Sequence, residues 1–132
     1  MAGSTSVKRK GEGYMKFNAM FQPINIGPMT VKNRFVVPPM GNNFAKTDGT
    51  WSDESVAYYA ERAKGQFGLI TIEATVVHKG AKGGPRKPCL YDDNSIESLK
   101  KITDACHAEG AKISIQLQNA GPEGNAKNAG AP

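Results

Sequence analysis

Short apolar runs alternate with helix-like patterns along most of this 132-residue chain. Runs of strand length predict strands at residues 34–39, 67–73 and 112–117. Between them, apolar residues recur at helical spacing, which predicts helices over 53–64 and 94–109. Strands that alternate with helices pair in parallel through right-handed crossovers. The pattern therefore predicts an α/β fold built on three adjacent parallel strands.

Two shorter apolar–polar alternations precede the first of these strands. They cover 24–26 and 29–32 and flank Gly27-Pro28, a turn dipeptide, so a β-hairpin is expected there. The segment 79–88 is rich in Gly, Pro and Lys, and we expect a loop without regular structure. The sequence after residue 117 is expected to be an open loop to the end of the chain.

Composition places the chain among ordinary globular domains, with 39% hydrophobic and 22% charged residues. Much of the net charge of +5 lies near the N-terminus, where residues 1–14 predict a disordered leader before one domain at 15–132. No nucleic-acid partner is therefore expected. Cys89 and Cys106 have neither metal-site spacing nor a disulfide framework, so free thiols are expected and no metal site. No apolar run approaches the ~20 residues of a membrane span, and a cytoplasmic location without a membrane partner is expected.

Polar or backbone-exposing residues follow each predicted core strand. They are Pro38-Pro39-Met40, then Glu73-Ala74, then Gln116-Leu117. In parallel α/β architectures, ligands bind outside the carboxyl ends of the strands. These three places are therefore the first candidates for a cofactor site.

Several segments with a shared order and spacing strengthen this interpretation. They are Phe21–Gly27, Val31–Asn43, Asp48–Thr50, Tyr58–Gly65, Gly68–Ile70, Glu73-Ala74, Tyr91–Asp93, His107–Ile113 and Gln116-Leu117. Together they resemble the N-terminal part of the Old Yellow Enzyme family of FMN-dependent NAD(P)H:flavin oxidoreductases. The nearest clade is that of enoate reductase and 2,4-dienoyl-CoA reductase, and the resemblance covers about residues 17–121.

The resemblance implies the N-terminal portion of a TIM (β/α)8 barrel, with about three βα units and a hairpin that closes the bottom. FMN is expected at the carboxyl mouth. The positions that correspond to flavin contacts are Pro38, Pro39, Met40, Gly41, Ala74 and Gln116. A neutral amide can hydrogen-bond the pyrimidine edge of a flavin, and a small side chain lets the ring approach the backbone.

The implied activity is reduction of an activated C=C bond by hydride transfer from the flavin, with NAD(P)H as reductant. The implied substrate is a small enoate or enoyl-CoA-like molecule, and a homo-oligomer is compatible with this reading. Any 4Fe-4S cluster or FAD would belong to domains outside this chain. Two alternatives stay open: an inactive truncated barrel fragment, and an amine-oxidising or demethylating flavin barrel.

The chain also departs from the family pattern. Asn119 and Pro122 stand where the family usually has His and Arg, and Gly41 stands where some members have Cys. No catalytic residue is assigned, because the substrate-binding pair, the proton donor and the FMN phosphate site are expected beyond residue 132.

Charged residues near the candidate site admit two readings. Glu73 could orient a group at the barrel mouth or form an ion pair with a Lys or Arg. The cations of the basic segment are expected to be solvated, with attraction of a CoA phosphate as the alternative. They are Lys79, Lys82, Arg86 and Lys87. His78 is expected at the surface, and His107 at the cation-favouring end of the second helix.

Overall fold

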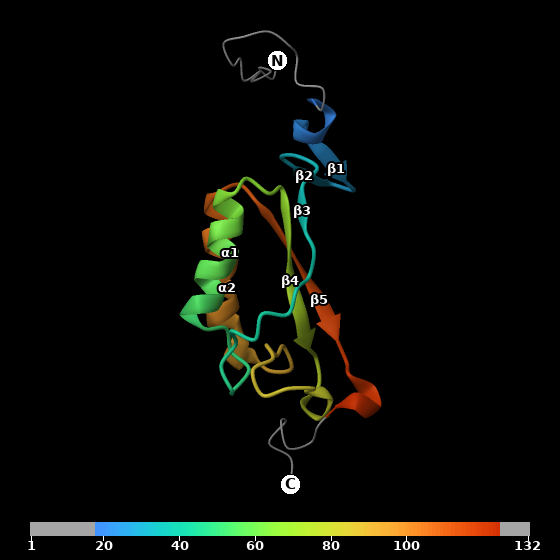
Figure 1. Ribbon diagram of the computed structural model, residues 1–132, viewed down its shortest axis with the longest axis vertical. Coiled ribbons are helices and arrows are strands. Elements are labelled where there is room, and N and C mark those ends of the chain that lie inside the picture. The colour runs from blue at the N-terminus through green and yellow to red at the C-terminus, as the bar shows by residue number, and fades with distance from the viewer. Residues whose placement is uncertain (1–17, 125–132) are drawn as a thin grey trace.

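A three-stranded parallel sheet organises the computed structural model, which describes residues 18–124 (Figure 1). Its strands are β3 (Val36–Val37), β4 (Leu69–Val76) and β5 (Lys112–Gln118), in the order β3-β4-β5. Both neighbouring pairs are parallel. The prediction of three adjacent parallel strands is confirmed.

The strand boundaries differ from those expected. β3 covers only Val36–Val37 of the predicted 34–39, in part because Pro38 and Pro39 have no N–H to donate to a ladder. β4 begins at Leu69 and continues to Val76, three residues beyond the predicted end at 73. The extension forms because β5 supplies pairing partners for Thr75 and Val76.

Two helices cover one face of the sheet (Figure 1). α1 spans Asp53–Lys64, as predicted, and begins where the Ser52 hydroxyl accepts the Ser55 N–H at 3.2 Å. α2 spans Ile96–Ala108 and follows a 3-10 turn, η3 (Asp93–Ser95), so the start of the helix predicted over 94–109 is tighter than expected.

The main core lies between this face and the two helices. Ile70 and Ile72 of β4 meet Tyr59 of α1 and Ile102 and Cys106 of α2, and all five are at most 1% exposed. Side chains alternate along a strand, so Thr71 points to the opposite face, where its hydroxyl lies 2.8 Å from that of Ser114 on β5. One face of the sheet is thus apolar and covered, and the other carries polar groups.

The predicted hairpin is confirmed at the amino end of the sheet (Figure 1). β1 (Ile24–Ile26) pairs antiparallel with β2 (Met29–Val31) after a 3-10 turn, η1 (Asn18–Phe21). Close packing joins it to the start of β4. A Cβ on Gly68 would lie 2.7 Å from both the Asn33 carbonyl oxygen and Val31 Cγ1.

Two segments expected to lack regular structure contain short helical turns. The basic segment has η2 (Lys79–Ala81), where the His78 ring accepts the Gly80 N–H, and η4 (Gly121–Glu123) follows β5. The predicted leader at 1–14 and the last part of the predicted terminal loop lie outside the described residues. Within residues 18–124, none of the helices has the length and apolar character needed to cross a membrane.

Candidate functional site

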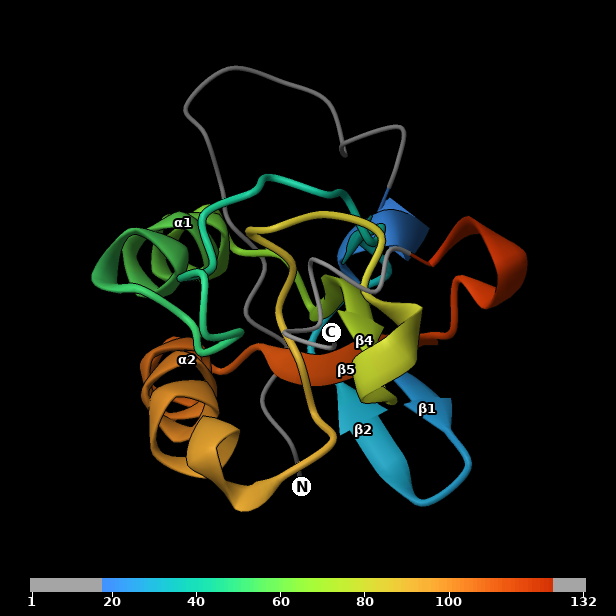
Figure 2. The same cartoon turned by 90° about the horizontal axis from the view of Figure 1, so that it is seen from below.

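The carboxyl ends of β3, β4 and β5 form one edge of the sheet, which Figure 2 shows from below. The segment after β3 enters this edge through Pro38-Pro39, of which Pro38 is exposed and Pro39 half-buried. Met40 and Gly41, which follow, are both exposed. Parallel pairing therefore puts this segment at the same edge as the ends of β4 and β5, where the sequence predicted a site.

A β-bulge brings two of the candidate residues together. Ile72 pairs with Ile115 and Thr75 with Leu117, so Glu73 and Ala74 both lie opposite the single residue Gln116. Ala74 was expected to follow the strand, and the structure instead places it inside β4. Bulges bend a strand and redirect its side chains, and they are common next to active sites.

Glu73 anchors the segment after β3 to the bulge. Its side chain is 0% exposed, and Oε2 accepts the Asn42 N–H at 3.2 Å. Within the described residues Oε1 has no hydrogen-bond partner, and the carboxylate forms no ion pair. Burial raises the pKa of Glu73, an effect that the Asn42 N–H and the charge of Lys87 oppose. Of the two readings left open for Glu73, its bond to the segment after β3 favours the orienting one.

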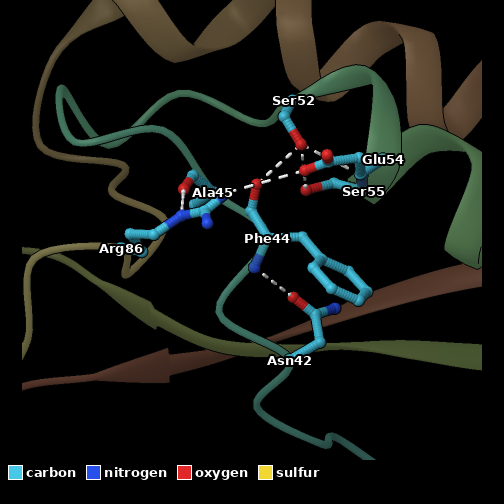
Figure 3. A network of polar contacts seen from close by, with 7 residues as sticks. All are labelled: Asn42, Phe44, Ala45, Ser52, Glu54, Ser55 and Arg86. Carbon is cyan, nitrogen blue, oxygen red and sulfur yellow. Dashed lines mark hydrogen bonds and ion pairs between the residues drawn. The ribbon is translucent and has the colours of Figure 1, made fainter.

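A circuit of hydrogen bonds continues from Asn42 to α1 (Figure 3). The Asn42 side-chain oxygen accepts the Phe44 N–H at 2.8 Å, and the Phe44 carbonyl accepts the Ser52 hydroxyl at 2.6 Å. From the next turns of α1, the Tyr59 hydroxyl accepts the Glu73 N–H at 3.0 Å. The segment after β3 is thus tied to the bulge at one end, through Glu73, and to the start of α1 at the other, through Ser52.

Two cations of the basic segment also hold this region: Lys82 is buried, contrary to the expectation that it is solvated, whereas Arg86 stays exposed. Lys82 is 1% exposed and donates to the Thr47 carbonyl at 2.8 Å. Arg86 donates through Nε to the Ala45 carbonyl at 3.0 Å and pairs with Glu54 at 3.5 Å (Figure 3). The carbonyls of an irregular segment need donors, and cations from the neighbouring segment supply them.

Gly49 and Cys89 are in close contact across these two segments. Gly49 accepts the Cys89 N–H at 2.9 Å and has a φ of 92°, and a Cβ on it would lie 2.7 Å from Cys89 Sγ. Both cysteines are free, as the spacing predicted, and both are buried. Burial raises the pKa of Cys89, and that of Cys106 to about 11, so neither thiol is a ready nucleophile at neutral pH.

The edge offers groups suited to a planar heteroaromatic ligand. The Gln116 side chain is exposed and, within the described part of the chain, makes no hydrogen bond, so both its donor and its acceptor are available. Ala74, opposite Gln116 in the bulge, adds only a methyl group to this edge, and Gly41 adds no side chain, although the Lys87 ammonium lies 3.1 Å from the place where a Gly41 Cβ would be. Among residues 18–124, no cluster of His, Cys, Asp and Glu could hold a metal ion.

Asn42, Tyr59 and Lys82 contribute to this edge although no site role was predicted for Asn42 or Tyr59. Tyr59 fits the apolar spacing of α1, and only its hydroxyl reaches Glu73. The sequence gives a weak indication for Asn42, because a polar residue that follows a proline-terminated strand can lie at a site. Nothing in the sequence indicates that Lys82 is buried.

Comparison with known proteins identifies the family. Residues 19–130 match the profile of the NADH:flavin oxidoreductase / NADH oxidase family. Cinnamate reductase from Clostridium sporogenes is 36% identical over 107 residues, which are 77% of this chain and 16% of that protein. The chain thus spans about one sixth of that relative.

Solved structures agree in fold. A 2-naphthoyl-CoA reductase in complex with 2-naphthoyl-CoA matches with a TM-score of 0.80 and 34% identity, over 86% of this chain and 17% of that one. Old Yellow Enzyme from Pichia sp. AKU4542 matches with a TM-score of 0.79 and 33% identity, over 86% of this chain and 30% of that one. The predicted fold, the N-terminal portion of a TIM barrel, is confirmed. The chain belongs to the NADH:flavin oxidoreductase / NADH oxidase family.

Proposed function

We propose that the full-length protein carrying this chain is an FMN-dependent NAD(P)H oxidoreductase that reduces an activated C=C bond. Within it, residues 15–132 form an incomplete FMN-binding barrel domain. The observation that carries the proposal is the convergence of Gly41, Ala74 and Gln116 on the carboxyl edge of a chain from this family. Bound FMN would supply the hydride for the reduction.

The chain's own contribution is to bind and orient the flavin ring. The free amide of Gln116 can donate to a carbonyl and accept from an N–H, the alternation that a pyrimidine edge presents. Ala74, opposite Gln116 in the bulge, has only a methyl side chain, which would not obstruct a ring bound beside Gln116. Pro38 and Pro39 restrict the backbone that leads to Met40 and Gly41, whose N–H groups can serve as further donors.

The geometry of the edge fits this role because hydrogen bonds from buried residues hold its backbone in place. Glu73 holds Asn42, and Tyr59 holds the backbone of Glu73. Preorganised contacts of this kind lower the cost of ordering a site when a ligand binds.

The substrate we propose is a small enoate or an enoyl-CoA-like thioester. Cinnamate reductase and 2-naphthoyl-CoA reductase, both similar to this chain, are named for one substrate of each kind. Since the chain spans 16–17% of these two proteins, the groups that select and protonate a substrate are proposed to lie elsewhere in the full-length protein.

Spectroscopy of the full-length protein tests the proposal. We expect flavin absorbance after loading with FMN, bleaching by NADH or NADPH under anaerobic conditions, and reoxidation when cinnamate or an enoyl-CoA is added. A protein that binds no FMN would overturn the proposal and favour an inactive barrel. Bleaching by an amine but not by either nicotinamide would instead favour an amine-oxidising flavin barrel.

A further inference from the structure

Lys87 differs from the other cations of the segment between β4 and α2. Lys82 and Arg86 donate to carbonyls, and the Lys79 ammonium lies 5.8 Å from the ring centre of Tyr91. Within residues 18–124, the Lys87 ammonium has no hydrogen bond and no ion pair, although the side chain is half-buried. Its charge is therefore not used in a hydrogen bond or an ion pair of the described residues.

The Lys87 ammonium lies against Gly41. A Cβ on Gly41 would be 3.1 Å from Lys87 Nζ and 3.8 Å from Glu73 Oε2. The backbone of Gly41 is not in the left-handed region. The absence of a side chain, rather than an unusual φ, is therefore what lets the ammonium approach this peptide.

Hydrogen bonds hold the backbone that follows Lys87. The Pro88 carbonyl accepts the Val76 N–H at 2.9 Å, and Cys89 donates its N–H to Gly49 at 2.9 Å. The Lys87 carbonyl itself accepts the Cys89 thiol at 3.4 Å. The ammonium thus extends from a fixed point beside the end of β4 toward the segment after β3.

Glu73 lies beneath the same peptide. It is fully buried, whereas Gly41 is exposed and Lys87 half-buried. A ligand laid on Gly41 would therefore meet the ammonium before it met the carboxylate. The Lys87 charge lowers the pKa of Glu73, although the two side chains form no ion pair within residues 18–124.

We propose that Lys87 places a positive charge beside the flavin ring at Gly41 and raises the reduction potential of that flavin. The inference rests on the proposed function. Two-electron reduction makes a flavin more negative, and a cation a few ångströms away in a partly buried site favours the more negative state. Lys87 is accordingly a tuning residue.

The test compares reduction potentials of the FMN-loaded full-length protein, measured by anaerobic equilibration with a dye of known potential. Lys87→Gln is expected to lower the equilibrium constant for two-electron reduction about tenfold, which corresponds to ~30 mV. Lys87→Arg should stay close to the wild type. Lys79→Gln, which removes a charge from the same segment, is the matched control and should leave the potential unchanged.

A second variant keeps the test open if Lys87→Gln does not fold. Gly41→Ala inserts a methyl 3.1 Å from the ammonium and should displace it while retaining the charge. We expect a shift of the potential in the same direction as for Lys87→Gln, but smaller. No shift in either variant would overturn the inference.

Two further outcomes distinguish failure of the proposed function from failure of the role assigned to Lys87. A wild-type protein that binds no FMN would overturn the proposed function itself, and the inference with it. Benzoate, as a probe, distinguishes a charge that serves the substrate from one that serves the flavin. An unchanged potential with benzoate binding weakened about tenfold in Lys87→Gln would overturn the flavin assignment and give the charge to a substrate carboxylate.

Discussion

The face of the sheet under α1 and α2 and the carboxyl edge both bury side chains, but they bury opposite kinds of group. Under the helices, Ile70, Ile72 and Ile102 are each 0% exposed and meet other apolar side chains. At the edge, Glu73 is as deeply buried, with one carboxylate oxygen that has no partner in the described residues. Burying a charged group costs free energy unless it is paired. The covered face therefore stabilises the fold, whereas the edge gives up stability to hold a segment in place.

The bulge in β4 marks the boundary between the two regions. Ile72, the last residue before it, belongs to the apolar core, and Glu73, the next, belongs to the edge. A substitution on either side should therefore separate stability from ligand binding. All of the following measurements use the full-length protein.

The largest effect is expected under the helices. Ile72→Ala removes buried methyl groups and leaves a cavity, and it should lower the free energy of unfolding by about 2–5 kcal/mol. Ile96→Ala, at a position that is 53% exposed, is the control and should change it by less than about 0.5 kcal/mol. Urea denaturation measures both. Equal effects of the two variants would refute the location of the core.

Tyr59→Phe tests the contact between the two regions. It removes only the hydroxyl that accepts the Glu73 N–H, so the buried N–H loses its partner at a cost of about 1–3 kcal/mol. Tyr58→Phe is the matched control, because the neighbouring hydroxyl makes no hydrogen bond within residues 18–124. If both variants denature at the same urea concentration, the circuit through Glu73 does not contribute to stability.

Glu73→Gln tests how the buried carboxylate at the edge changes stability with pH. Burial raises the pKa of Glu73 in the folded protein above its ordinary value of 4.5, so the folded state favours the protonated carboxyl. That contribution is complete below pH 4.5 and is lost as the pH rises through the raised value. The wild type should lose stability relative to Glu73→Gln over this window, while the glutamine oxygen can still accept the Asn42 N–H.

Urea midpoints of both proteins between about pH 4 and pH 8 measure this difference. The two curves should diverge as the pH rises and become parallel above the window. Curves that stay parallel throughout would mean that the carboxyl ionises in the folded protein as it does in the unfolded chain.

The smallest effect is expected from Gln116→Ala, which should leave stability unchanged. If its amide binds the flavin, the variant loses about 0.5–1.5 kcal/mol of FMN binding, or roughly a few-fold to ten-fold in Kd. Lys112→Ala, at the amino end of the same strand, should leave FMN binding as in the wild type. Titration of the apoprotein with FMN measures both Kd values. Equal Kd values for the two variants would mean that Gln116 does not bind the flavin and is an ordinary rim amide.

Element type and order were readable from the sequence because they depend on neighbouring residues. α1 covers the predicted 53–64 between Ser52 and Gly65, and the hairpin forms around Gly27. Pro38 and Pro39 end β3 because a proline cannot donate to a ladder. The parallel order followed from the alternation of strands and helices, and with it the edge at which Ala74 and Gln116 lie. The flavin contacts assigned to these residues stay predictions.

Only the tertiary structure decided how that edge is built. The bulge that sets Glu73 and Ala74 opposite Gln116 depends on the register of β5 against β4, which the β4 sequence does not contain. Lys82 is buried because the segment around Thr47 has carbonyls without donors, and only the packed chain brings the two together. Local sequence determined which elements form, since helix caps and strand periods act over a few residues. The contacts between loops far apart in the chain depend on the space left when those elements pack.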